Sequence, residues 1–131
     1  MRWTNLKSFL VFLFGFLPLA YGANGSIIYL NPANALELIR NNQAVNIIDI
    51  RTDEEFNQGH LANAQNIDYL KPEFEEQINR LNSNAEYLFY CRSGARTQQA
   101  LDILGKKQFT KLYILQGGIM SWQRFGNPVV R

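Results

Sequence analysis

The residue best suited to do chemistry in this sequence is its single cysteine, Cys91. It follows the apolar and aromatic run from Glu86 to Tyr90 and opens the segment Cys91-Arg92-Ser93-Gly94-Ala95-Arg96. Neighbouring arginines, backbone N–H groups and the start of a helix all stabilise a thiolate, which is the nucleophilic form of cysteine. We therefore expect Cys91 to be a nucleophile, and a buried, inert thiol is the alternative.

The segment after Cys91 has the composition of an anion-binding loop. Gly94 permits a tight turn, and a helix predicted from about Thr97 to Lys106 adds a partial positive charge at its start. The backbone N–H groups from Arg92 to Arg96 can then point inward at the sulfur. The residues predicted to bind the substrate in this way are Arg92, Ser93, Gly94, Ala95 and Arg96.

The elements that must position this loop alternate between strand and helix. Strands are predicted at 26–30, 44–50, near 66–67, at 86–90 and at 111–115. Helices are predicted after Asn31-Pro32, after Thr52 with Glu55 as a capping box, after Lys71-Pro72, at about 97–106 and at 119–125. This order predicts an α/β fold around a mostly parallel sheet, with Cys91 at the carboxyl end of a strand, where such sheets bind ligands.

Composition and the N-terminal segment suggest one exported domain. The chain has 131 residues, of which 47% are hydrophobic and 18% charged, as in an ordinary globular domain. The basic Arg2 and Lys7 flank a short region before the apolar stretch from Phe9 to Ala20, which is typical of a signal peptide and short for a membrane span. We predict a signal peptide at 1–22, a single domain at 23–131 and a periplasmic or secreted location, with an uncleaved anchor as the alternative.

The predicted mature domain has no excess of positive charge. Without Arg2 and Lys7 the basic residues equal the 11 acidic ones, which gives no electrostatic argument for nucleic acid or a membrane surface as partner. Small molecules or proteins fit better. A lone cysteine also excludes an intramolecular disulfide, which points to chemistry in an exported domain.

Three motifs in the same order resemble those of the rhodanese family of thiosulfate and persulfide sulfurtransferases. They are Cys-Arg-Ser-Gly-Ala-Arg at 91–96; Ile48-Asp49-Ile50-Arg51 followed by Glu55-Phe56, Gly59-His60-Leu61 and 64–67; and Leu115-Gln116-Gly117-Gly118 with Trp122. Each motif is short, but their joint order is specific. The resemblance implies a three-layer rhodanese-like domain that needs no metal or organic cofactor.

The resemblance also implies a two-step reaction at Cys91. The thiolate attacks the outer sulfur of a donor such as thiosulfate, sulfite leaves, and the resulting persulfide passes its sulfur to a thiol or to cyanide. The expected partners are a small anionic sulfur donor and a thiol acceptor. For a periplasmic protein, we interpret the acceptor as a thiol-disulfide protein.

The resemblance further suggests roles for residues outside the loop. Asp49 is expected to help hold the loop, as is Thr97, and Arg96 is expected either to bind the donor or to pair with Asp49. Arg51 is expected to reach the pocket mouth, with a solvated surface charge as the alternative. His60, the only histidine, is expected to be structural and not a catalytic base, as are Trp122 and the glycine pair.

Two other functions remain open from the sequence. Related folds use a cysteine, a loop and an arginine for phosphatase or arsenate reductase chemistry, but those loops have five residues between cysteine and arginine, and here there are four. The second alternative is a non-catalytic rhodanese-like binding module, against which the intact cysteine and two arginines argue.

Overall fold

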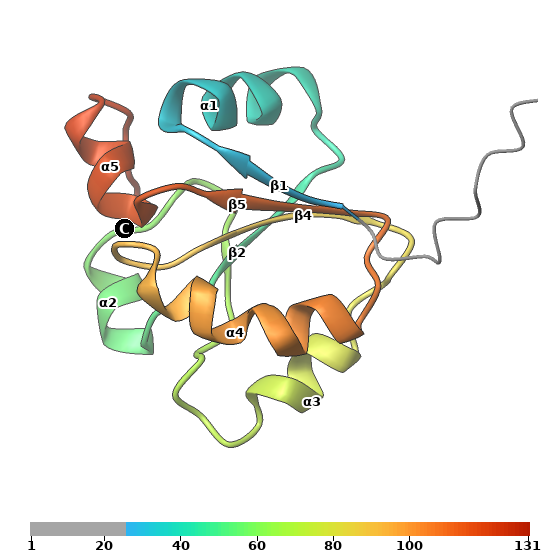
Figure 1. Cartoon of the computed structure of the whole chain (residues 1–131). Helices are drawn as coiled ribbons and strands as arrows, with labels where there is room; N and C mark the ends of the chain where they lie inside the picture. Colours follow the sequence, from blue (N-terminus) through green and yellow to red (C-terminus); the bar gives the residue numbers. More distant parts are fainter. Residues whose placement is uncertain (1–25) are drawn as a thin grey trace, which may run out of the picture.

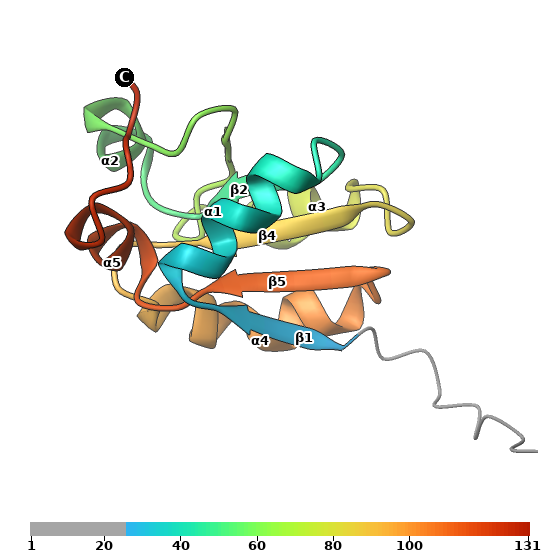
Figure 2. The same ribbon diagram turned by 90° about the horizontal axis from the view of Figure 1, so that it is seen from above.

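A five-stranded parallel sheet forms the centre of the computed structural model, which describes residues 26–131 (Figures 1 and 2). The strand order is β1-β5-β4-β2-β3, and every neighbouring pair is parallel. The strands are β1 (Ile27–Leu30), β2 (Asn46–Asp49), β3 (Gln65–Asn66), β4 (Glu86–Tyr90) and β5 (Lys111–Leu115). These features confirm the predicted α/β fold with a parallel sheet. The predicted signal peptide at 1–22 lies outside the described residues.

Helices cover both faces of this sheet. They are α1 (Pro32–Asn41), α2 (Asp53–Gln58), α3 (Phe74–Asn79), α4 (Ala95–Lys106) and α5 (Gly118–Arg124). Figure 1 shows α1 and α5 on one face and α3 and α4 on the other, while α2 follows the carboxyl end of β2. Among the described helices, none combines the length and apolar character that a bilayer crossing requires.

The side chains of β4 alternate between two hydrophobic cores, because successive residues of a strand point to opposite faces. Tyr87, Phe89 and Cys91 belong to the core that includes residues of α3 and α4. Leu88 and Tyr90 belong to the core that includes residues of α1 and α5. Cys91 therefore faces the α4 side of the sheet, and its neighbour Tyr90 faces the other side.

The start of α2 agrees with the sequence prediction, and the starts of α3 and α4 differ from it. The capping box at the start of α2 is present, since the Thr52 hydroxyl accepts from the Glu55 amide and the Glu55 carboxylate accepts from the Thr52 amide. The helix expected at Lys71-Pro72 begins instead at Phe74, because the preceding residues form turns closed by bonds such as that from the Lys71 amide to the Asp68 carbonyl. The helix α4 begins two residues before the predicted Thr97, which brings its first turn closer to Cys91.

Candidate active site

The sulfur of Cys91 lies between the end of β4 and the start of α4. Only 1% of the residue is exposed. The Gly94 amide donates to Sγ at 3.1 Å, and the Thr97 hydroxyl lies 3.9 Å from Sγ while donating to the Gly94 carbonyl at 2.8 Å. Gly94 has a φ of +104°, in the left-handed region that favours glycine. Gly94 and the buried Thr97 thus border the sulfur, and among the loop amides from Arg92 to Arg96 that of Gly94 alone donates to Sγ.

The loop is held from its other side by the first amides of α5. The Ile119 amide donates to the Cys91 carbonyl at 2.9 Å, and the Met120 amide donates to the Arg92 carbonyl at 3.1 Å. In a trans peptide the C=O and N–H groups point in opposite directions, so the amides that follow these carbonyls point away from α5. Sequence reasoning missed this support, although the Gly117-Gly118 pair marks its position.

Gly118 allows this close approach of α5 to the loop. A Cβ atom at this position would lie 2.3 Å from the Cys91 carbonyl oxygen and 2.5 Å from the backbone of Arg92. The atoms in its way are backbone and cannot rotate aside. A side chain at residue 118 would therefore push the helix and the loop apart.

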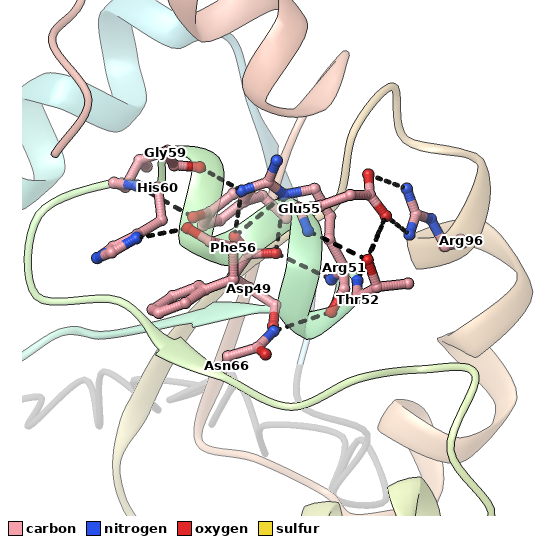
Figure 3. A network of polar contacts seen from close by, with 11 residues as sticks. Asp49, Arg51, Thr52, Glu55, Phe56, Gly59, His60, Asn66 and Arg96 are labelled. Carbon is pink, nitrogen blue, oxygen red and sulfur yellow. Dashed lines mark hydrogen bonds and ion pairs between the residues drawn. The ribbon is translucent and has the colours of Figure 1, made fainter. Parts of the chain in front are cut away.

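A second cluster follows β2 and is built around a buried ion pair (Figure 3). Asp49 is 0% exposed and Arg51 is 6% exposed. Arg51 Nη2 lies 2.7 Å from Asp49 Oδ2 and also donates to the Gly59 carbonyl at 2.6 Å, and Arg51 Nε donates to both Asp49 oxygens at 3.1 Å. Burial disfavours the charged guanidinium, but Asp49 outweighs this effect and raises the pKa of Arg51. The solvated surface charge that was the alternative for Arg51 is therefore wrong.

Tyr90 connects this cluster to the strand that carries Cys91. Its hydroxyl accepts from the Leu61 amide at 3.1 Å, and the Arg51 guanidinium lies 5.8 Å from the centre of its ring. Burial and then the charge of Asp49 raise the pKa of Tyr90 above its ordinary range, so this hydroxyl stays protonated. The cluster thus fixes the last residue before the cysteine.

Arg96 pairs with Glu55 of α2 and not with Asp49. Arg96 Nη1 lies 2.6 Å from Glu55 Oε1, and Nη2 lies 2.9 Å from Oε2 (Figure 3). Hydrogen bonds from Arg96 lower the pKa of Glu55 to about 2. The predicted alternative of an Arg96–Asp49 pair is wrong, because Asp49 is enclosed on the Tyr90 face of the sheet and its oxygens already accept from Arg51.

Asp49 does not contact the Cys91 loop through its carboxylate. Its support reaches the loop only through the sheet, where Asp49 is the register partner of Tyr90 and the Ile50 amide donates to the Tyr90 carbonyl. The strand pleat explains this, since Tyr90 and Cys91 point to opposite faces. Its predicted role in holding the loop is therefore indirect.

Two of the remaining predicted residues, Ser93 and Arg51, line separate hollows. A groove of about 330 Å³ is lined by Ser93, Gly94 and Thr97 together with Tyr29, Gln98, Ile114, Leu115, Gln116 and Gly117. Gly94 and Thr97, which lie next to Sγ, thus also line this groove. A smaller polar hollow of about 200 Å³ is lined by Arg51, Glu55, Gln58, Gly59, Ile119 and Gln123. Arg92 and Ala95 are exposed, and a donor-binding role for Arg51 stays a prediction.

His60 packs against the end of the short helix α2. The His60 ring stacks on Phe56 at 3.7 Å between centroids, and its Nδ1 lies 2.9 Å from the Phe56 carbonyl oxygen. These contacts agree with the structural role predicted for His60. Within residues 26–131, no group of three His, Cys, Asp or Glu side chains is placed to hold a metal ion.

The sequence and the fold are both similar to known proteins. Residues 31–125 match the sequence model of the rhodanese-like domain. A sulfurtransferase of Allochromatium vinosum is 34% identical over 85 residues, which are 64% of this chain and 77% of that protein. The crystal structure of a rhodanese-related protein from Thermoplasma volcanium has a TM-score of 0.68 and 30% sequence identity, and the match covers 79% of this chain and 97% of that one.

Another relative has a name that indicates different chemistry. A tRNA uridine(34) hydroxylase of the Aster yellows witches'-broom phytoplasma is 33% identical over 98 residues, 72% of this chain. The match covers only 32% of that protein, so most of the hydroxylase lies outside the region that is similar to this chain. The shared domain therefore occurs in proteins with more than one named activity.

Proposed function

The chain belongs to the rhodanese-like domain family, and from this we propose that it is a sulfurtransferase that carries a sulfur atom as a persulfide on Cys91. The donor in this proposal is thiosulfate or a persulfide, and the acceptor is a thiol or cyanide. The name of the Allochromatium vinosum relative supports the reaction class, and the loop geometry supports the choice of atom.

The observation that carries the proposal is the 3.1 Å contact from the Gly94 amide to Cys91 Sγ at the start of α4. An N–H donor and the positive end of a helix dipole both stabilise negative charge, as on a sulfur atom that attacks a donor or carries a persulfide. The other loop amides make no hydrogen bond to Sγ among the described residues. Their role is to stabilise the outer sulfur once it is added, as fixed donors stabilise an oxyanion.

The proposed reaction conserves charge at each step. The Cys91 thiolate attacks the outer sulfur of thiosulfate, a new S–S bond forms, and the S–S bond of the donor breaks. Sulfite leaves with the electron pair of that bond, and Cys91 keeps a persulfide anion. In the second step an acceptor thiolate attacks the outer sulfur and restores the Cys91 thiolate.

Arg92 is the cation that we assign to donor attraction. Its side chain is exposed and forms no ion pair in the described part of the chain, in contrast to Arg96. A free positive charge next to the loop raises the local concentration of an anionic donor. In this proposal the donor approaches the buried sulfur from the groove lined by Ser93, Gly94 and Thr97.

Intact-protein mass spectrometry tests the proposal directly. Purified protein is treated with thiosulfate and compared with the variants Cys91→Ser and Ser26→Ala, the latter at an exposed serine that precedes β1. We expect wild type and Ser26→Ala to gain the mass of one sulfur atom, to release sulfite, and to lose the added mass on treatment with a small thiol. Cys91→Ser should gain nothing.

Two results would overturn this proposal. One is the absence of a sulfur adduct with thiosulfate and with a small-molecule persulfide, which would favour a non-catalytic binding module. The other is efficient hydrolysis of an aryl phosphate without sulfur transfer, which would favour a phosphatase. Comparing cyanide, small thiols and a periplasmic dithiol protein as acceptors would then identify the second substrate.

We also propose that the domain acts after export, with a periplasmic thiol-disulfide protein as its acceptor. The apolar stretch from Phe9 to Ala20 supports this location. The test is expression of the full chain in a bacterium, followed by fractionation and N-terminal sequencing. A mature protein that begins near Ala23 in the periplasmic fraction is expected, and an uncleaved cytoplasmic protein would contradict export.

A further inference from the structure

One carboxylate, that of Glu55, connects the starts of two helices beside the Cys91 loop. As the third residue of α2, Glu55 accepts from the Thr52 amide at 3.3 Å and the Thr52 hydroxyl at 3.2 Å. The same side chain forms the two-bond pair with Arg96 in the first turn of α4. Figure 3 shows the Glu55 carboxylate between Thr52 and Arg96.

This pair neutralises most of the positive charge that Arg96 brings to the first turn of α4. A cation in the first turn of a helix adds to the positive end of the helix dipole, and a carboxylate beside it cancels most of its field. Hydrogen bonds to Glu55 raise the pKa of Arg96; burial opposes this rise, and the charges of Glu55 and Cys91 add to it. The charge of Cys91 thus acts on Arg96, whose guanidinium is paired with Glu55.

We propose that Glu55 is a positioning residue that sets the charge preference of the site: by pairing with Arg96 it leaves Arg92 as the uncompensated cation of the loop and disfavours dianionic sulfur donors relative to monoanionic ones. This inference rests on the proposed sulfurtransferase function. It concerns which donors the site prefers, whereas the proposed function concerns whether sulfur is transferred. The two pairs of charges, Glu55 with Arg96 and Asp49 with Arg51, leave the loop with one free guanidinium.

The test compares two donors that differ by one unit of charge at the same reacting bond. Thiosulfate is a dianion and releases sulfite, and methanethiosulfonate is a monoanion and releases methanesulfinate. In both, the Cys91 thiolate attacks the outer sulfur and the leaving group departs with the electrons of the broken S–S bond. The measurement is kcat/KM for each donor at low ionic strength, with one fixed thiol acceptor.

Replacing Glu55 by Gln should raise kcat/KM for the dianionic donor more than for the monoanionic donor. The interaction of a donor with the added positive potential scales with its charge, so the logarithm of the change for thiosulfate should be twice that for methanethiosulfonate. We expect kcat/KM to rise by about tenfold for thiosulfate and about threefold for methanethiosulfonate, and added salt should reduce both changes. Glu54→Gln, an exposed neighbour on α2 with the same change in net charge, serves as the matched control and should change the ratio by less than about 1.5-fold, since it is solvent-screened.

A double variant separates charge from structure. Arg96→Gln alone should reduce kcat/KM for thiosulfate more than for methanethiosulfonate, because Glu55 then faces the loop unpaired. The combination of Glu55→Gln with Arg96→Gln has the wild-type net charge and should restore the wild-type ratio between the two donors. This double variant also keeps the test informative if Glu55→Gln alone folds poorly.

Equal changes for both donors in Glu55→Gln would overturn the inference and leave Glu55 with a purely structural role. A double variant whose donor ratio stays as far from wild type as that of either single variant would do the same. If the wild-type protein transfers sulfur from neither donor, the proposed function fails first. The inference fails and the proposed function stands if wild type transfers sulfur but the ratio of kcat/KM for the two donors is the same in wild type and Glu55→Gln.

Discussion

Two adjacent strands end at the same edge of the sheet, yet the groups that follow them are bonded very differently. After β2, Asp49 and Arg51 form a closed pair in which the guanidinium donates to both carboxylate oxygens and to the Gly59 carbonyl. After β4, the Cys91 sulfur has one amide donor at 3.1 Å and one hydroxyl at the long distance of 3.9 Å. The Asp49–Arg51 pair is thus saturated with hydrogen bonds within the protein, whereas the Cys91 sulfur has room for a further donor or atom. How completely a polar group is bonded therefore distinguishes the two ends of the sheet edge, and the less completely bonded one is the proposed reactive group.

The largest effect should come from breaking the saturated pair. Arg51→Met leaves Asp49 buried without its partner and should lower the free energy of unfolding by about 3–5 kcal/mol. Chemical denaturation measures the loss, and the double variant with Asp49→Asn should recover part of it. If Arg51 instead binds the donor, the variant will raise the KM for thiosulfate more than tenfold without this loss of stability.

The contact between α5 and the loop should respond in both stability and activity. Gly118→Ala places a methyl group 2.3 Å from the Cys91 carbonyl oxygen, and we expect a loss of about 3 kcal/mol together with slower sulfur loading. Gly105→Ala is the matched control, because nothing lies within 4 Å of a Cβ there and the residue is in α4, where alanine is favoured. Thermal denaturation of both variants distinguishes a local clash from a general effect of losing glycine.

Acid should weaken the link between the two helices that flank the reactive region. The pKa of Glu55 is lowered in the folded protein to about 2, so as the pH falls the unfolded chain takes up this proton first, near its ordinary value of 4.5. The stabilisation is complete above pH 4.5 and is lost as the pH falls towards 2. About a quarter of this side chain is exposed, and solvent therefore screens part of the interaction. We expect the ionised Glu55 to contribute about 2 kcal/mol to the free energy of unfolding. Denaturation at several pH values should show a shallower dependence in Glu55→Gln than in Glu54→Gln.

The smallest effect should come from the free cation of the loop. Arg92→Gln removes an exposed charge with no ion pair in the described chain, so the melting temperature should stay within about 1 °C of wild type. The KM for thiosulfate should rise by about fivefold through weaker attraction, as measured by sulfite release. Arg124→Gln, at the exposed end of α5, serves as the control and should change neither value. An unchanged KM for thiosulfate in Arg92→Gln would contradict the proposal that Arg92 attracts the donor.

The position of the reactive loop could be predicted from sequence because it depends on local patterns. The buried runs of β2, β4 and β5, and the turn at Gly94, show where strands stop and a helix begins. Cys91 at the end of β4 follows from these patterns alone. The capping box of Thr52 and Glu55 is equally local, since both halves lie within one turn.

The pairing of charges could not be predicted in the same way because it depends on strand register and on the pleat. Glu55 and Arg96 are 41 residues apart, and their contact requires that α2 and α4 begin at the same edge of the sheet. The carboxylate chosen for Arg96 from sequence, that of Asp49, is adjacent in the sheet but faces the opposite core. Likewise, the glycine pair at 117–118 predicted a break in the chain but not the contact of α5 with the Cys91 and Arg92 carbonyls.

The bonds from α5 to the loop make two amides into built-in reporters of the state of Cys91. The Ile119 and Met120 amides can exchange with deuterium only when their bonds to the Cys91 and Arg92 carbonyls open. If Cys91 takes up and releases sulfur as proposed, a loop rearrangement that opens these bonds would change the exchange rates of two α5 amides that donate to loop carbonyls and not to Sγ. Hydrogen exchange would then follow the proposed loading of Cys91 without a chromophore or a label at the sulfur.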